Sequence, residues 1–237
     1  MSGLDRLDGP ISLQDSEKKL DLGLCSPSQA GFTLASINRF FPMNVGTQWE
    51  YEGEEEEGTL RLLVTVLDET RVVDGVTTRV IEEREFLDDE LFEVSWNYHA
   101  TRPDGTVCYF GEDVDIFEDG EIVHDGAWCS QDNPDVNKPG IFMPADPQPG
   151  MKFQAEVAPG VAEDEVKIIG QGKVTVPFGS FTETIRFREF NPLDGEKDYK
   201  VYAAGVGLII DGVAELLSFT LNGEDPGDPI SEQACGG

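Results

Sequence analysis

The side chains of this chain that could do chemistry are carboxylates and aromatic rings, because the only histidines are His99 and His124. In the predicted hairpin register these two lie about four residues apart, or roughly 13 Å at the rise of a β-strand. They therefore cannot readily share a metal ion or a substrate atom. No spacing of Ser, Cys and His predicts a nucleophilic triad. We interpret each histidine as a surface or interface residue rather than a ligand.

Carboxylates could bind calcium, which prefers several carboxylate and carbonyl oxygens. Asp113, Asp115, Glu118 and Asp119 are close enough in sequence to offer some. Their spacing lacks the Asp-x-Asp-x-Asp-Gly loop, and strand alternation places Asp113 and Asp115 on one face. A solvated acidic face is the preferred interpretation, so no cofactor is predicted, with calcium as the alternative.

Paired carboxylates can also hydrolyse glycosides. With 47 acidic residues, some pair always has the right separation, so proximity alone predicts nothing. Aromatic residues spread over consecutive predicted strands are the other candidates for ligand binding. Core packing is their ordinary use, and a cavity inside a wide barrel is the alternative. The six aromatic candidates are Trp49, Tyr51, Trp96, Tyr98, Tyr109 and Trp128.

Turn signals predict the elements that position these side chains. An Asp-Gly step supplies the positive φ of a tight hairpin. Three such steps, at Asp74-Gly75, Asp104-Gly105 and Asp119-Gly120, and a weaker turn at Asp88-Asp89 separate five long strands. The sequence predicts an all-β fold: an antiparallel up-and-down meander of about ten or eleven long strands, forming a barrel or a curved β-clam. The later reversals are expected near Gly160, Gly179-Ser180, Asp194-Gly195 and Asp211-Gly212.

Register is less certain than the turns. Turning at Asp74-Gly75 pairs Val73 with Val76, and continuing that register places Val66 opposite Glu83. Such a pairing of a core residue with a carboxylate is poor, so we expect a bulge between these strands. Glycines in the strand-like run near Gly205 and Gly207 predict bulges or a close approach of backbones.

The organisation of the chain follows from composition. We predict a polar arm at 1–31, a single β domain at 32–221 and a tail at 222–237. Within the domain, meanders at 47–130 and 151–221 flank a proline-rich crossing loop at 131–150. The loop is a connector or a lid, because Ile141, Phe142 and Met143 give it an apolar tip that must be buried. The arm wraps the surface or pairs with a sheet edge of this chain or of a neighbour.

Four cysteines make an even number without a Cys-x-x-Cys pair, which favours disulfides over a zinc site. Hairpin register places Cys108 opposite Cys129, or diagonal to it, within reach of a bond. Cys25 and Cys235 would then join the termini. Oxidised pairs indicate an extracellular or periplasmic protein, and four free thiols in a cytosolic protein are the alternative.

The formal net charge is -30, which repels nucleic acid and anionic membrane surfaces. Neither is an expected partner. No apolar run reaches the ~20 residues of a membrane-spanning helix, so no transmembrane segment is predicted. No export signal is recognised near the first residue, and it would have been removed from a mature chain.

Five motifs stand out along the chain: Phe41-Pro42 with Gly46, Trp49, Tyr51 and Gly53; Tyr109-Phe110-Gly111-Glu112; Pro139-Gly140 with Met143-Pro144; Val176-Pro177-Phe178-Gly179-Ser180-Phe181; and Tyr202 with Gly205-Val206-Gly207. Together they resemble a family of exported bacterial proteins, many of them lipoproteins, with no activity assigned to them. The resemblance covers about residues 32 to 221 and implies export and a β-rich fold. It implies no catalytic residue, although Glu112, in a family-like stretch beside a glycine bend, is the acid to watch as a ligand-binding or catalytic residue. Cys108 departs from the aromatic residue expected there.

Three hypotheses for function follow. The first is an exported, non-enzymatic β-barrel protein that binds an apolar small molecule or lipid. The second is a structural subunit of a cell-surface or extracellular assembly, which self-associates by strand addition through residues 1–31. The third is an acid-dependent hydrolase that uses Glu112 and neighbouring acids.

Overall fold

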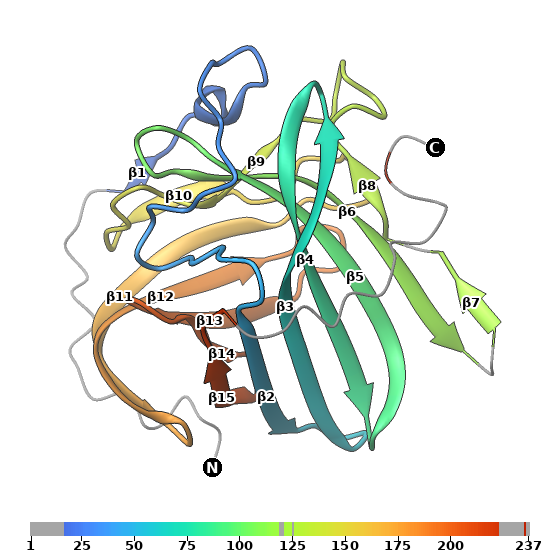
Figure 1. The fold of residues 1–237 in the computed structure, drawn as a ribbon, viewed down its shortest axis with the longest axis vertical. Coiled ribbons are helices and arrows are strands. Elements are labelled where there is room, and N and C mark those ends of the chain that lie inside the picture. The colour runs from blue at the N-terminus through green and yellow to red at the C-terminus, as the bar shows by residue number, and fades with distance from the viewer. Residues whose placement is uncertain (1–16, 119–120, 125, 223–234, 236–237) are drawn as a thin grey trace.

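The computed structural model describes residues 17–118, 121–124, 126–222 and 235 as one curved, twisted sheet with little other regular structure (Figure 1). Apart from the strands, its only regular element in this part of the chain is the short 3-10 helix η2 (Leu22–Cys25). The strands are β1 (Lys18–Lys19), β2 (Gln48–Glu54), β3 (Thr59–Val73), β4 (Val76–Leu87), β5 (Glu90–Thr101), β6 (Val107–Glu118), β7 (Glu121–Val123), β8 (Trp128–Cys129), β9 (Gly140–Met143), β10 (Met151–Gln154), β11 (Glu165–Val176), β12 (Gly179–Phe190), β13 (Lys197–Ala203), β14 (Gly207–Asp211) and β15 (Ala214–Thr220).

The sheet consists of two meanders joined side by side. Its order is β1-β10-β11-β12-β13-β14-β15-β2-β3-β4-β5-β6-β7, with β8 and β9 also pairing with β6. All neighbours are antiparallel except β1 and β10. The predicted antiparallel meander is confirmed, in the form of an open, curved sheet rather than a closed barrel. The count of fifteen strands exceeds the predicted number because the arm, the crossing loop and the end of the first meander add short strands.

The turns form where the sequence predicts them. Asp74 and Gly75 have φ of 52° and 75°, and Asp88 and Asp89 have 48° and 67°, which is the left-handed pair of a tight hairpin. The predicted turn at Asp119-Gly120 lies outside the described residues. Gly205, with φ of 82°, lies in the turn between β13 and β14. Its N donates to Arg39 O at 2.7 Å, so the predicted close approach of backbones is present there.

The expected bulge between β3 and β4 is present, and it changes which residues of the two strands pair. Val73 pairs with Val76 as predicted, but the register shifts between Val66 and Thr70. Val66 therefore lies opposite Ile81, and Val64 lies opposite Glu83. The shift brings Ile81 opposite Val66. Glu83 keeps the face of β4 that it has in the predicted register, because the shift is by two residues.

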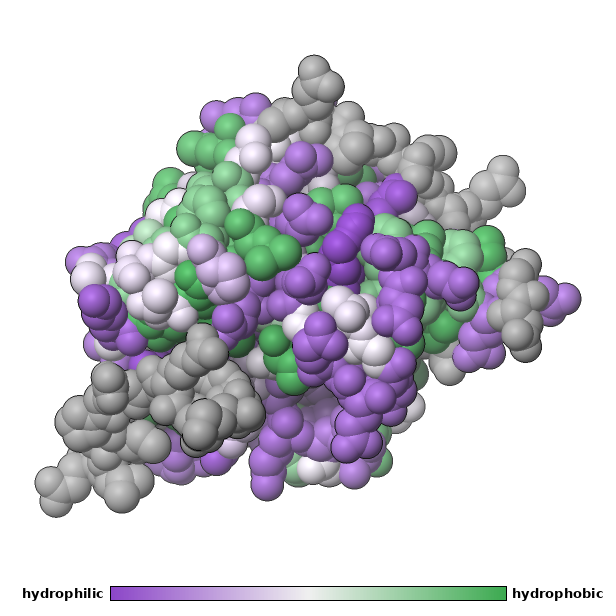
Figure 2. All heavy atoms as spheres, turned by 90° about the horizontal axis from the view of Figure 1, so that it is seen from below, coloured by the Kyte–Doolittle hydropathy of each residue, from purple (hydrophilic) through white to green (hydrophobic). Residues whose placement is uncertain are grey.

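The core lies where the curved sheet encloses the crossing loop and the segment before β2. Ile141 and Met143 of the loop are fully buried, and Phe142 packs against them at the edge of a cavity. The predicted burial of the apolar tip is thus confirmed. Seen from below, the outer surface mixes hydrophilic side chains with smaller apolar patches (Figure 2).

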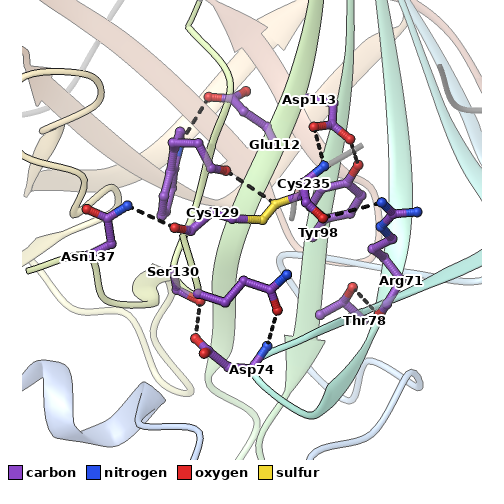
Figure 3. The surroundings of a disulfide bond; sticks show 12 residues. Arg71, Asp74, Thr78, Tyr98, Glu112, Asp113, Cys129, Ser130, Asn137 and Cys235 are labelled. Carbon is purple, nitrogen blue, oxygen red and sulfur yellow. Dashed lines mark hydrogen bonds between the residues drawn. A yellow bond between two sulfur atoms is a disulfide. The ribbon is translucent and has the colours of Figure 1, made fainter. Parts of the chain in front are cut away.

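Both disulfides differ from the predicted pairs. Cys25 bonds to Cys108 and Cys129 bonds to Cys235, with Cα separations of 5.5 and 5.6 Å. The prediction was wrong because an extra residue enters after β7, which shifts Cys129 opposite Gly111. That position is three residues from Cys108, about 10 Å along the strand, and too far for a bond. Figure 3 shows Cys235 held on β8 beside Asp113 and Tyr98.

The described part of the arm pairs with its own sheet. Lys18 N donates to Gly150 O at 3.0 Å, and Leu20 N donates to Lys152 O at 2.8 Å, so β1 extends the edge at β10. After η2, Thr33 bridges to Thr101 of β5. No helix among the described residues is long and apolar enough to cross a membrane.

Candidate functional site

A cavity of about 220 Å³ opens on the concave face of the sheet. Its lining comes from both meanders, the crossing loop and the segment before β2, so only the curved sheet assembles it. Aromatic rings form one part of the wall and carboxylates form the other. The lining residues used below are Trp49, Tyr51, Glu83, Glu85, Glu93, Asn97, His99, Tyr109, Glu112, Phe142, Glu156, Lys200, Tyr202 and Asp211.

The aromatic wall is held rigidly by hydrogen bonds. Trp49 Nε1 donates to Val206 O at 2.7 Å, and Tyr51 hydroxyl donates to Leu208 O at 3.0 Å. Both acceptors lie at the start of β14, next to Gly207, where Pro42 and Trp49 leave little room for a side chain. The predicted close approach at Gly207 is therefore present, and it fixes the faces of both rings.

The carboxylate wall is unusual because its members are poorly hydrated. Burial raises the pKa of Glu83 and of Glu112 to about 7. Burial, together with the nearby Glu83 charge, raises the pKa of Glu85 to about 9. Burial also raises the pKa of Glu93 and that of Glu156 above the ordinary range. Near neutral pH this wall therefore holds several protons.

Among the residues that the structure describes, Lys200 is the only lysine or arginine that lines the cavity. Its ammonium lies 3.3 Å from Glu189 and 3.5 Å from Asp211. Burial lowers the pKa of Lys200, but these two carboxylates outweigh burial and raise the pKa well above its usual value. One permanent positive charge thus faces a larger group of carboxylates.

A bulge in β6 brings Tyr109 and Glu112 to the same face although they are three residues apart. The register with β5 shifts between the Asn97–Glu112 and His99–Tyr109 pairs. Gly111 has φ of 136°, and a Cβ there would lie 2.2 Å from Trp128 O, so only glycine fits. The predicted glycine bend is confirmed, and it turns the Glu112 carboxylate into the cavity.

Hydrogen bonds hold the side chains of Glu112 and Tyr109 in place. Trp128 Nε1 donates to Glu112 Oε1 at 3.2 Å, and Tyr109 hydroxyl donates to Asn97 Oδ1 at 2.5 Å. The rings of Tyr109 and Trp128 pack edge to face, with centroids 5.4 Å apart. Trp128 therefore supports the cavity wall from behind without lining the cavity itself.

Two of the aromatic candidates belong to the opposite, convex face. Trp96 Nε1 donates to Glu82 at 3.2 Å, and Tyr98 hydroxyl donates to Asp113 (Figure 3). Strand alternation explains the split, because the residues of β5 that line the cavity are the odd-numbered Glu93, Ser95, Asn97 and His99. Of the six aromatic candidates, only Trp49, Tyr51 and Tyr109 line the cavity.

The calcium candidates do not gather into one site. Asp113 accepts from Tyr98 and from Cys235 N, while Asp115 lies 2.7 Å from His124 Nδ1. Glu118 is exposed, and Asp119 lies outside the described residues. Across the described ranges, the only acidic, histidine or cysteine groups close enough to share an ion are Cys129, Asp132 and Cys235, and both of these sulfurs are in a disulfide.

His99 is buried, which corrects its interpretation as a surface or interface residue. Its ring stacks on Tyr109 with centroids 4.7 Å apart and meets Phe142 edge to face at 4.5 Å. Burial lowers the pKa of His99 to about 3, so the ring is neutral at physiological pH. The crossing loop covers it with Phe142, a contact that strand register alone does not predict. His124 is partly exposed, at 37% of its side chain.

Sequence reasoning missed most of the carboxylate wall and Lys200. A signal for Glu83 and Glu85 did exist, because their alternation on β4 placed them opposite core valines. We interpreted that pattern as evidence for a shift in register. It also indicated that the two acids face the concave side of the sheet. Glu156, Lys200 and Asp211 carried no comparable signal, because they reach the cavity only through the joining of the two meanders.

Comparison with known proteins supplies no relative for this arrangement. No family model, curated protein or solved structure matches the chain. The resemblance to exported bacterial proteins therefore stays a prediction, and the cavity has to be interpreted from its own chemistry.

Proposed function

We propose that this chain is an exported, non-enzymatic binding protein whose concave cavity takes a small organic cation. The observation that carries the proposal is the pairing of an aromatic wall with desolvated carboxylates in one cavity. Aromatic faces attract cations, best when water is excluded. A bound cation also favours the ionised form of a nearby carboxyl group, so binding releases protons from the wall and adds a direct charge interaction. Tyr51, Tyr109 and Trp49 supply the rings, and Glu83, Glu85 and Glu112 are among the acids.

The size of the cavity limits the ligand. A volume of about 220 Å³ is smaller than the ~300–1,000 Å³ of typical pockets for drug-sized molecules. It corresponds to about seven water molecules at ~30 Å³ each. A complete lipid chain is too large for this space, so the proposal replaces the predicted apolar molecule or lipid by a compact amine or quaternary ammonium ion.

The separation of the carboxylates favours an organic cation over a metal ion. Within the described part of the chain, no three acids of the cavity bring their oxygens within metal-binding distance of one another. A calcium ion needs six to eight oxygens at about 2.3–2.6 Å. An organic cation is larger and needs only dispersed negative charge around it.

The two disulfides support export. Both disulfides join segments far apart in the chain, and such bonds persist in oxidising compartments. The second hypothesis, assembly through the arm, is less favoured because residues 18–20 already pair with the edge at β10. The proposed location is the periplasm or the extracellular space.

Calorimetric titration with choline and with its neutral isostere 3,3-dimethylbutanol tests the proposal. We expect choline to bind and the alcohol to bind at least about tenfold more weakly, because only choline carries the charge. Glu112→Gln is expected to weaken choline binding. The matched control is Glu118→Gln, an exposed acid on the same strand, with no effect. Equal binding of both probes, or of neither, would contradict the proposal.

A hydrolase that uses Glu112 is the second candidate. One observation favours it: burial raises the pKa of Glu112 to about 7, which is suited to a general acid near neutral pH. If purified protein cleaves a glycoside, Glu112→Gln should abolish turnover while Glu118→Gln leaves it intact. Unchanged turnover in Glu112→Gln would reject this assignment.

A further inference from the structure

Four basic side chains form a row across four adjacent strands, on the face of the sheet opposite the cavity. Lys19 of β1 pairs with Lys152 of β10, Lys152 pairs with Lys167 of β11, and Lys167 pairs with Arg188 of β12. Directly paired residues point to the same side of a sheet. Neighbouring strands lie about 4.8 Å apart, so the row is about 14 Å long. We call these four residues the basic row.

The basic row is on the convex face. Its neighbours in sequence, Val166 and Phe187, are buried among the core residues, and Glu189 binds the cavity lysine Lys200. Alternation therefore sends Lys167 and Arg188 to the other side. A groove of about 440 Å³ follows the row, with Lys197 at its margin.

Composition does not account for the row. Like charges placed directly opposite on neighbouring strands destabilise a sheet. The whole chain has only 17 basic residues against 47 acidic ones, yet these four stand side by side. A structural role for the row would have been served better by opposite charges.

A carboxylate already occupies the middle of the row. Glu17 Oε2 lies 2.8 Å from Lys152 Nζ, and Oε1 lies 2.7 Å from Lys167 Nζ. These two lysines lower the pKa of Glu17 to about 2. Among the described residues, no ion pair reaches Lys19 or Arg188 at the two ends. The row can thus bind several anionic groups, and within the chain Glu17 occupies only its centre.

We propose that the basic row binds an acidic polysaccharide, with Glu17 as a built-in competitor. The ligand must carry carboxylates in a line that repeats at about the strand spacing. A uronate polymer carries one carboxylate on each sugar ring, and each ring is about as long as the distance between adjacent strands. Rotation about its glycosidic bonds turns successive carboxylates toward the row. Lysine suits it, since an ammonium binds carboxylates as a point charge without a fixed geometry.

An acidic peptide fits less well. In an extended peptide, side chains on one face repeat at about 6.8 Å, which soon falls out of step with cations about 4.8 Å apart. The large negative charge elsewhere on the protein does not prevent binding at physiological ionic strength, because charges more than about 8 Å away are then largely screened. The site lies on the face opposite the cavity, so it does not depend on the proposed cation.

Titration of the full chain with tetragalacturonate at 0.15 M salt tests the proposal. Lys167→Gln is expected to weaken binding about fivefold, as for the loss of one exposed charge contact. Glu17→Gln is expected to tighten binding about threefold, because it removes the competing carboxylate. The matched control is Lys173→Gln, an exposed lysine elsewhere on β11, which should leave the affinity unchanged.

A larger loss in Lys167→Gln than in Lys173→Gln is the distinctive result, since general charge attraction gives a common effect for every lysine. Equal losses in Lys167→Gln and Lys173→Gln would overturn the site. Tetraglutamate binding as tightly as tetragalacturonate would overturn the polysaccharide assignment. Absence of any binding to the unaltered protein and to Glu17→Gln would overturn the proposal as a whole. Circular dichroism of each variant checks that the fold is retained.

Discussion

The concave cavity and the convex basic row both crowd like charges, but the sheet deals with them differently. Around the cavity lysine Lys200, Glu189 and Asp211 expose only 15% and 14% of their side chains. In the row, Lys152 and Lys167 expose 40% and 30%. Desolvation in the cavity favours neutral carboxylates, whereas water and Glu17 screen the lysines. Equal crowding therefore has a large cost only where burial removes the solvent.

Removing the cavity lysine is the strongest way to test this difference. Lys200→Met leaves Glu189 and Asp211 without their cation, and we expect a loss of about 3 kcal/mol in unfolding free energy at pH 8. The loss should shrink at pH 5, because Glu189, with its pKa of about 7, then takes a proton. Denaturant unfolding at both pH values measures this. Lys197→Met at the margin of the row is the control, expected within about 0.5 kcal/mol of the unaltered protein.

The pH dependence of stability follows from the same carboxylates. Burial raises the folded pKa of Glu83 to about 7 and of Glu85 to about 9, above their ordinary value of 4.5. The folded state then holds more protons than the unfolded state, so these groups stabilise it most at low pH. We expect the melting temperature to fall as pH rises from 5 to 9. A flat or rising profile would contradict the burial of this wall.

Glu83→Gln sharpens the pH prediction. The variant lacks the charge that burial disfavours, so we expect about 1–2 kcal/mol more stability at pH 8.5, equivalent to about 2–8 °C in melting temperature. The gain should disappear near pH 5. Glu56→Gln, in the exposed turn after β2, is the control and should change neither value. Thermal unfolding monitored by circular dichroism at both pH values measures the two melting temperatures.

The smallest effect is expected on the convex face. Arg188→Gln removes one member of the row that has no ion pair among the described residues, and it relieves repulsion from Lys167. We expect a change between zero and about 0.5 kcal/mol, in the stabilising direction. A loss greater than 1 kcal/mol would show that Arg188 is structural and would remove the contrast between the two faces.

Local signals in the sequence were sufficient for the strands and most of the turns. Asp74-Gly75 and Asp88-Asp89 carry their own backbone preference, so they form hairpins without help from distant residues. Inner and outer faces followed from alternation only as far as the first bulge. Beyond it, the shift at Val66 changed which residues pair, and the bulge at Gly111 changed which residues share a face. Local preference does not fix such shifts, since they satisfy packing across strands.

The disulfides and the cavity show most clearly what could not be predicted from the sequence. Cys108 and Cys129 lie on neighbouring strands, yet one extra residue after β7 moves them apart and gives each a partner from a chain end. Tyr109 and Glu112 were recognised as candidates, but Lys200 and Asp211 were not. These residues meet only because β15 pairs with β2 and joins the two meanders.

By itself, the sequence determined an acidic, all-β ribbon that reverses at its Asp-Gly steps, because turn conformation and alternation act between near neighbours. The tertiary structure decided the sheet order, the cysteine partners and the opposite charge of the two faces. Those features depend on contacts between residues far apart in the chain, such as Cys25 with Cys108 and Tyr51 with Leu208. Their geometry is set by how bulges and buried side chains fit together, which no local pattern specifies.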